Sequence, residues 1–379
     1  MKDVDYWVWL SSLAGLGPVK ARRLLEKYGH PQVLYDLPES KLKEQGLLTQ
    51  KNMDELLSRE KREGLSKIKD LMLKNNIKVI TLFDKSYPEK LKHIYDPPVA
   101  IYYRGSFALS EFSVAVVGSR RTTNYGFITA KKLSYELALR GVQIVSGMAR
   151  GIDSIAHEGC LDAGGRTVAV LGCGPDYIYP PENARLYESI IKSGGLILSE
   201  YPPGTPPLQY NFPARNRIIS GISSGVLIVE AAQRSGSLIT ASYALEQGRE
   251  VFAVPGNIDC AYSSGTNRLI REGAKIVLGV GDILEEFGYR EEKAPVPWYR
   301  DSQRRGTVDT YSGTGHKTYC GLSTGEIRVV KTIQKGIHHI DEIIQHCNIS
   351  ISEINNILFM LEMKGIVAQL PGKFFELCQ

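Results

Sequence analysis

The most regular hydrophobic pattern lies between residues 113 and 287. Seven short apolar runs recur there, with room for one helix between each and the next, at residues 114–118, 142–147, 167–172, 196–201, 225–232, 250–256 and 274–279. Each run is almost continuously apolar, as is typical of a strand that helices cover on both faces. The alternation predicts an α/β fold, a doubly wound, mostly parallel Rossmann-like sheet.

The segments on either side follow other patterns. Residues 66–111 contain two short strand-like runs, at 77–83 and 97–105, so we expect an extended domain over 66–287 with its core at 113–287. Residues 288–320 mix Pro, Gly, Ser, Thr and charged residues without periodicity, which predicts a linker. Residues 321–379 favour three helices and a closing hairpin, the outline of a winged-helix-like domain.

Residues 1–65 favour helices throughout, and a glycine-rich turn with basic residues at 15–23 separates the first two. This pattern is typical of a helix-hairpin-helix or SAM-like domain, in which a tight turn brings backbone N–H groups to a phosphate. A plain helical turn with Pro18 at the first helical position and solvated arginines explains the same residues. The pattern alone leaves both interpretations open.

Composition narrows the class of protein. A chain of 379 residues is longer than one hydrophobic core normally supports, and a net charge of +5 permits an anionic partner without requiring one. The six cysteines are scattered with no CxxC pair, as in reduced cytosolic proteins, and no apolar run is long enough to span a membrane. We expect a cytoplasmic protein with no metal site and no cofactor.

Candidate binding residues follow the predicted strands. The carboxyl ends of parallel strands meet at one edge of the sheet, which is where open α/β sheets bind ligands. Glycines, small hydroxyls and arginines recur at these ends, with two tyrosines and an asparagine: Gly118, Ser119, Arg120, Arg121, Gly147, Arg150, Gly172, Tyr177, Tyr179, Asn183, Arg185, Arg215, Asn216, Arg217, Ser235, Gly236 and Ser237. Backbone N–H groups in such turns and arginine side chains both bind phosphate. The pattern predicts a site for an anion or a polyphosphate.

The motifs of nucleotide enzymes are missing from these turns. The first turn lacks GxGxxG, and GxxxxGK[ST] does not occur, which argues against a dinucleotide enzyme and an NTPase. Asp153 and Glu230 are isolated acids: Asp153 fits the first turn of a helix, and Glu230 could pair with an arginine. Because no nucleophile, base and acid come together, we expect no catalysis.

Several longer stretches resemble the DNA processing protein A family (DprA, also called Smf). They include GSRRTTNYG, SGMARGIDSIAHEGC, FPARNRIISG, VEAAQRSGSLITASYALEQGREVFAVPG and GTNRLIREGA, and the resemblance covers residues 105–285. It implies single-stranded DNA binding, homodimerisation through the Rossmann-like domain, and loading of RecA recombinase during natural transformation.

The resemblance also assigns roles to residues. It implies that Arg120 contacts a DNA phosphate and that Tyr177 or Tyr179 stacks on a base, with the other strand-end residues sharing the pocket. Some relatives carry a lysine where Ala184 stands here, so Arg185 is the substitute candidate. Residues 321–379 hold five basic and six acidic residues, a net charge of −1, which favours a protein contact or weak duplex binding for the tail.

An enzyme is the competing hypothesis. The fold and the Ser-Gly-Ser turn also resemble nucleotide phosphoribohydrolases, in which a glutamate closely follows a glycine-rich turn. Here the next glutamate after Ser237 is Glu246. A nucleotide-sensing module with no polymer ligand is a third and weaker interpretation.

Overall fold

The chain forms two compact units, Met1–Arg290 and Glu291–Gln379. The computed structural model describes residues 1–13, 15–43, 48–289, 324–334, 336–347, 349–363, 366–370 and 373–377. The predicted linker at 288–320 therefore lies outside the described residues, apart from its first two. Among the described helices, none combines the length and the apolar character needed to cross a membrane.

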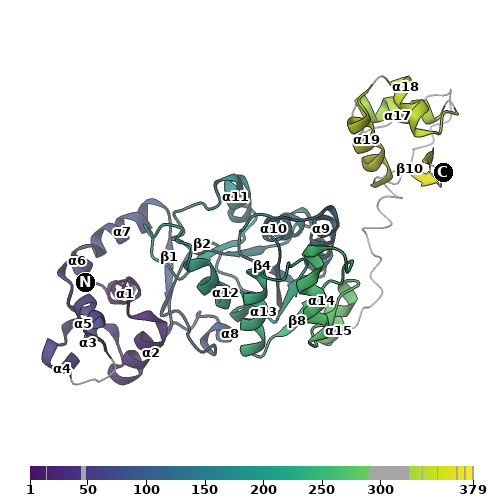
Figure 1. Ribbon diagram of the computed structural model, residues 1–379. Helices are drawn as coiled ribbons and strands as arrows, with labels where there is room; N and C mark the ends of the chain where they lie inside the picture. The colour runs from purple at the N-terminus through teal and green to yellow at the C-terminus, as the bar shows by residue number, and fades with distance from the viewer. Residues whose placement is uncertain are drawn as a thin grey trace. The chain divides into compact units, whose positions relative to one another are not determined.

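The first unit is built on one nine-stranded sheet in the order β1-β2-β6-β5-β4-β3-β7-β8-β9 (Figure 1). The strands are β1 (Lys78–Thr81), β2 (Ala100–Gly105), β3 (Ser113–Val117), β4 (Gln143–Ser146), β5 (Thr167–Val170), β6 (Leu196–Ser199), β7 (Gly225–Ile228), β8 (Glu250–Ala253) and β9 (Lys275–Ile276). The seven strands from β3 to β9 are parallel, and β2 joins β6 antiparallel, with β1 outside it. The predicted mostly parallel sheet is confirmed.

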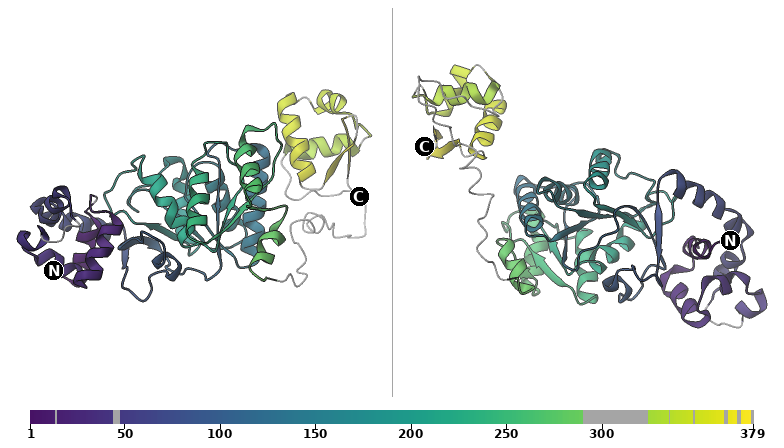
Figure 2. Two further views of the ribbon diagram at one scale, coloured as in Figure 1. Left: turned by 60° about the horizontal axis from the view of Figure 1, so that its bottom comes forward. Right: turned by 180° about the vertical axis from the view of Figure 1, so that it is seen from behind.

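Helices cover both faces of this sheet (Figures 1 and 2). On β3, Val114 and Val116 belong to the core under α9 (Asn124–Leu139) and α10 (Ile152–Asp162). The alternate residues Ala115 and Val117 face the core under α12 (Asn211–Gly221), α13 (Ser237–Glu246) and α14 (Ser264–Arg271). Burial on both faces explains why these strands are apolar at every position. Two further helices, α11 (Ala184–Lys192) and α15 (Val280–Glu286), pack on the α9–α10 side.

The direction in which strands are added reverses at β3. From β3 the chain adds β4, β5 and β6 on one side, and then crosses to add β7, β8 and β9 on the other. The carboxyl ends of β3 and β7 are therefore neighbours, with Val117 opposite Ile228. In open sheets a ligand crevice forms at such a reversal.

The N-terminal helices share the core of the same unit. They are α1 (Asp3–Ser11), α2 (Gly17–Tyr28), α3 (Pro31–Asp36), α4 (Glu39–Lys43), α5 (Gln50–Leu57), α6 (Arg59–Glu63) and α7 (Leu65–Lys74), and the short α8 (Glu89–Lys92) follows β1. Trp9 and Leu24 are buried in the cluster that includes Tyr102 of β2, and the Ser11 hydroxyl lies 2.7 Å from the Tyr102 hydroxyl. The helical segment is thus packed against the sheet.

The glycine-rich turn before α2 already holds a carboxylate. The backbone N–H of Gly15 donates to Glu55 Oε2 at 2.8 Å, and Asn52 Nδ2 donates to the Gly15 carbonyl at 2.6 Å. A phosphate that bound this amide would have to displace the Glu55 side chain. The local contacts therefore favour the plain helical turn.

The second unit contains the three predicted helices and the closing hairpin (Figure 2). These are α17 (Thr324–Gln334), α18 (Ile340–Cys347) and α19 (Ile351–Met363), followed by β10 (Val367–Leu370) and β11 (Phe374–Leu377), which pair antiparallel. The unit has its own core, in which Val329, Ile343 and Leu358 are buried. The winged-helix outline predicted from the sequence is confirmed.

Candidate nucleic-acid interface

Arginine and aromatic side chains occur in the segments that follow the carboxyl ends of the parallel strands. Arg120 and Arg121 follow β3 and are exposed, Tyr177 and Tyr179 lie in the loop after β5 and are 39% and 37% exposed, and Phe212 is half-buried at the start of α12. We call these five residues the strand-end surface.

Ring contacts join three members of the strand-end surface. The rings of Tyr179 and Phe212 have centroids 5.3 Å apart at an interplanar angle of 32°. The Arg120 guanidinium lies over the Phe212 ring, 5.8 Å from its centroid. A cation beside exposed aromatic faces is the combination that binds phosphates and stacked bases together. The strand-end pattern does not include Phe212 among the predicted site residues, although an aromatic three residues before the first arginine of FPARNR is an available signal.

Gly172 makes the aromatic arrangement possible. A Cβ atom at Gly172 would lie 2.8 Å from Cδ1 of Phe212, so any larger residue would push the Phe212 ring away. The glycine after β5 thus serves the packing of the platform. This role differs from the predicted one, in which the strand-end glycines bring backbone N–H groups to a phosphate.

The loop that carries Tyr177 and Tyr179 is tied to the start of α10. Asn183 Nδ2 donates to the Met148 carbonyl at 2.8 Å and to Ser154 Oγ at 3.0 Å. Arg150 forms an exposed ion pair with Glu182 at 2.5 Å. Asn183 therefore holds the loop in place with its amide donors, and Arg185, in the first turn of α11, is exposed.

At two strand-end turns, backbone N–H groups already donate hydrogen bonds to carboxylates of the protein itself. Asp153, in the first turn of α10 as predicted, accepts hydrogen bonds from the N–H groups of Gly147 at 3.1 Å and Ala149 at 3.4 Å. Glu230, two residues after β7, accepts from the N–H of Thr123 at 3.1 Å and from the Thr123 hydroxyl. Glu230 thus pairs with the N-cap of α9, and the predicted backbone nests at these turns are already filled by the protein.

Arg215 points inward, whereas the sequence pattern predicts it at the phosphate surface. Its side chain is 3% exposed, and Nη1 donates to the carbonyl oxygens of Gly147, at 2.7 Å, and Val170. It thereby joins the ends of β4 and β5 to α12. Burial raises the pKa of the Asp153 carboxyl, and the nearby Arg215 charge opposes that rise. Burial also lowers the pKa of Arg215, while Asp153 opposes that change.

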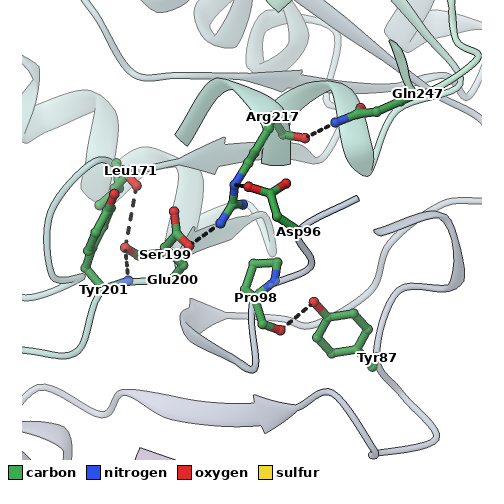
Figure 3. A network of polar contacts seen from close by, with 9 residues as sticks. All are labelled: Tyr87, Asp96, Pro98, Leu171, Ser199, Glu200, Tyr201, Arg217 and Gln247. Atoms are coloured by element: carbon green, nitrogen blue, oxygen red, sulfur yellow. Dashed lines mark hydrogen bonds and ion pairs between the residues drawn. The ribbon is translucent and has the colours of Figure 1, made fainter. Parts of the chain in front are cut away.

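Arg217 is also buried, and two carboxylates hold it (Figure 3). Its Nε lies 2.9 Å from Asp96 Oδ2, and its Nη2 lies 2.5 Å from Glu200 Oε2. The placement of Arg215 and Arg217 at the surface is therefore corrected, because both guanidinium groups are used inside the protein. Asn216, between them, contacts the Gly236 carbonyl through Nδ2 at 3.4 Å.

The remaining predicted residues shape the turns. Ser119 Oγ donates to the Arg121 carbonyl at 2.5 Å and accepts from the Arg121 N–H at 3.2 Å, which fixes the turn after β3. Ser235 Oγ lies 2.8 Å from Ser237 Oγ just before α13. Gly118 packs against Ile152. Among the described residues, no three potential metal-ligating side chains come together.

The glutamate that the hydrolase hypothesis would require is distant from the Ser-Gly-Ser turn. Ser237 is the first residue of α13 and Glu246 is the last. A helix of this length separates its ends by about 14 Å. The turn and Glu246 therefore do not form one site.

We predict effects of very different size on stability for two arginines that lie near each other, Arg215 and Arg120. Arg215→Ala leaves Asp153 buried beside strand-end carbonyls without its cation, so the free energy of unfolding should fall by about 3–5 kcal/mol. Arg120→Ala removes an exposed side chain and should change it by less than about 0.5 kcal/mol. Urea denaturation followed by circular dichroism measures both, and equal decreases would contradict the inward placement of Arg215.

Comparisons with known proteins agree with this architecture. Residues 78–288 match the family model of DNA recombination-mediator protein A, and residues 317–373 match the DprA winged helix domain. The Smf protein of Escherichia coli is 37% identical over 100% of this chain and 96% of its own length.

Two solved structures are also similar. The X-ray structure of DNA processing protein A from Streptococcus pneumoniae matches with a TM-score of 0.63 and 38% identity, and it covers 76% of this chain and 100% of that one. DNA processing protein A from Helicobacter pylori, described as having a unique single-stranded DNA binding mode, matches with a TM-score of 0.51 and 33% identity over 56% of this chain and 98% of that one. The chain therefore belongs to the DNA recombination-mediator protein A family, whose members are also named DprA and Smf.

Proposed function

We propose that this protein binds single-stranded DNA at the strand-end surface. The observation that carries the proposal is the contact of Arg120 with Phe212, whose ring packs beside Tyr179. Unpaired bases expose their faces to aromatic rings, and arginines bind the phosphates between them. The relative from Helicobacter pylori, which binds single-stranded DNA, supports the proposal.

The geometry divides several predicted residues, together with Phe212, into two groups. Arg120, Arg121 and Arg185 have exposed side chains and are proposed to contact phosphates, and Tyr177, Tyr179 and Phe212 are proposed to contact bases. The inward-facing group holds these side chains in place through the hydrogen bonds described above: Ser119, Asn183, Arg215 and Arg217. Stacking and phosphate contacts read no base edges, so we expect little sequence preference.

Arg120→Ala tests the proposed phosphate contact. For a single strand, removal of one phosphate-binding cation makes the slope of log affinity against log salt shallower by about 0.7. We expect the variant to bind a single-stranded oligonucleotide more weakly and with this shallower slope, as measured by fluorescence anisotropy across a salt series.

Arg166→Ala is the matched control for this measurement. Arg166 is exposed just before β5, at the opposite edge of the sheet from the strand ends. Its removal should leave the affinity and the slope unchanged. Equal slopes for Arg120→Ala and the parent protein would contradict the assignment of Arg120, and absence of binding by the parent would contradict the function.

We infer that a second copy of the chain pairs at β9, one of the two edge strands of the sheet. This strand has β8 on one side only, and the exposed side chains of Ile276 (46%) and Leu278 (78%) lie on and beside it. An unpaired edge with exposed apolar residues favours strand pairing or packing with another chain.

The edge proposal predicts that Ile276→Glu yields a monomer in analytical ultracentrifugation, because a buried charge would face the partner copy. Leu245→Glu, on an exposed position of α13, is the control and should leave the dimer intact. A parent protein that sediments as a monomer would rule out the dimer.

The wider role is proposed on family grounds. We propose that the bound strand passes to RecA recombinase during natural transformation, in the cytoplasm and without catalysis by this chain. Cys160, Cys173 and Cys347 are buried free thiols, as suits a reducing compartment.

On α19 of the tail, Phe359 and Met360 are about half exposed beside the acidic Glu362, which supports a protein contact there.

A further inference from the structure

Arg217 connects four separate parts of the first unit (Figure 3). Asp96 comes from the segment between α8 and β2, and Glu200 directly follows β6. The Arg217 carbonyl accepts a hydrogen bond from Gln247 Nε2, just after α13, at 3.0 Å. Through these contacts Arg217 fixes α12 to three other segments of the chain. We call Arg217, Asp96 and Glu200 the α12 clamp.

The charges of the α12 clamp keep Arg217 where it is. Its side chain is 4% exposed, against 13% for Glu200 and 28% for Asp96. Burial raises the pKa of both carboxyl groups, and the Arg217 charge opposes the rise in each. If Arg217 turned outward to a phosphate, the carboxylates of Asp96 and Glu200 would remain in a poorly solvated site without a cation to pair with. The side chain is therefore unsuited to contact DNA directly.

The clamp sits on the helix that carries part of the strand-end surface. Phe212 is the second residue of α12, and Arg217 lies five residues further along. Arg215 secures α12 to the ends of β4 and β5, while Arg217 secures it toward Glu200 and Asp96. Two anchors that point in different directions fix both the position and the rotation of the helix.

We propose that the α12 clamp positions Phe212 for stacking, so that Arg217 supports DNA affinity as a positioning residue and contacts no phosphate. This inference rests on the proposed single-stranded DNA function and assigns Arg217 a role different from that of Arg120. The inference depends on the two ion pairs through which Asp96 and Glu200 already engage the Arg217 guanidinium.

Two variants of the full chain test the clamp. Arg217→Met leaves both carboxylates without a cation, and Asp96→Asn/Glu200→Met/Arg217→Met removes all three charges together. Replacement of a buried ionic group by neutral residues of similar volume is often well tolerated, so the triple variant should keep α12 in place. The readouts are oligonucleotide affinity across a salt series and amide hydrogen exchange in α12.

We expect Arg217→Met to lower affinity about tenfold at every salt concentration, with an unchanged slope and faster exchange at residues 215–221, whose amides are bonded within α12. The triple variant should return to within about threefold of the parent affinity with parent-like exchange, although it also lacks the guanidinium. Arg120→Ala is the reference for removal of a phosphate-binding cation. If Arg217→Met does not fold, the triple variant alone tests the inference, through its slope of log affinity against log salt and its amide exchange in α12.

Two results would overturn the inference. A slope for the triple variant that is shallower by about 0.7, like that of Arg120→Ala, would show that Arg217 contacts a phosphate. Unchanged affinity and exchange in Arg217→Met would show that the clamp positions nothing. If the parent protein binds no single-stranded DNA, the proposed function fails, whereas hydrogen exchange still reports whether the clamp holds α12.

Discussion

The binding region depends on how the protein compensates two buried arginines at the strand ends, Arg217 with carboxylates and Arg215 with carbonyl oxygens. Arg217 lies between Asp96 and Glu200, and Arg215 lies among the carbonyls of Gly147 and Val170 beside Asp153. A buried charge is tolerated only when such partners compensate for the hydration it gives up. These contacts fix α12 across the ends of the strands, and exposed side chains are left to meet a ligand.

Internal pairing of polar groups also distinguishes this sheet from sheets whose backbone amides bind a nucleotide. In nucleotide-binding sheets, turn amides at helix starts hold phosphates. Here Glu230 and Asp153 accept hydrogen bonds from amides at two of the turns, and Glu55 does so at the glycine-rich turn before α2. Under the proposed function, phosphate binding then depends on side chains such as Arg120, an arrangement that suits a flexible polymer crossing an open surface.

The apolar pattern predicts the strands well because burial on both faces leaves a continuous signal that is local in the chain. The same pattern also predicts that several arginines lie in the turns at the carboxyl ends of the strands. It does not distinguish Arg120, which is exposed, from Arg217, which is buried, because the partners of Arg217 come from distant segments at Asp96 and Glu200. The strand order and the Tyr179–Phe212 contact depend on tertiary packing in the same way.

Single-stranded DNA that lies on the aromatic side chains at the strand ends should be close enough to react with them. Photo-crosslinking of an oligonucleotide that carries 5-iodouracil, followed by mass spectrometry of the peptides, tests this directly. We expect crosslinks to Tyr177, Tyr179 or Phe212, the rings of the strand-end surface, where the Arg120 guanidinium lies over Phe212. Crosslinks confined to α2 of the N-terminal hairpin or to α19 of the winged helix would contradict this placement of the DNA.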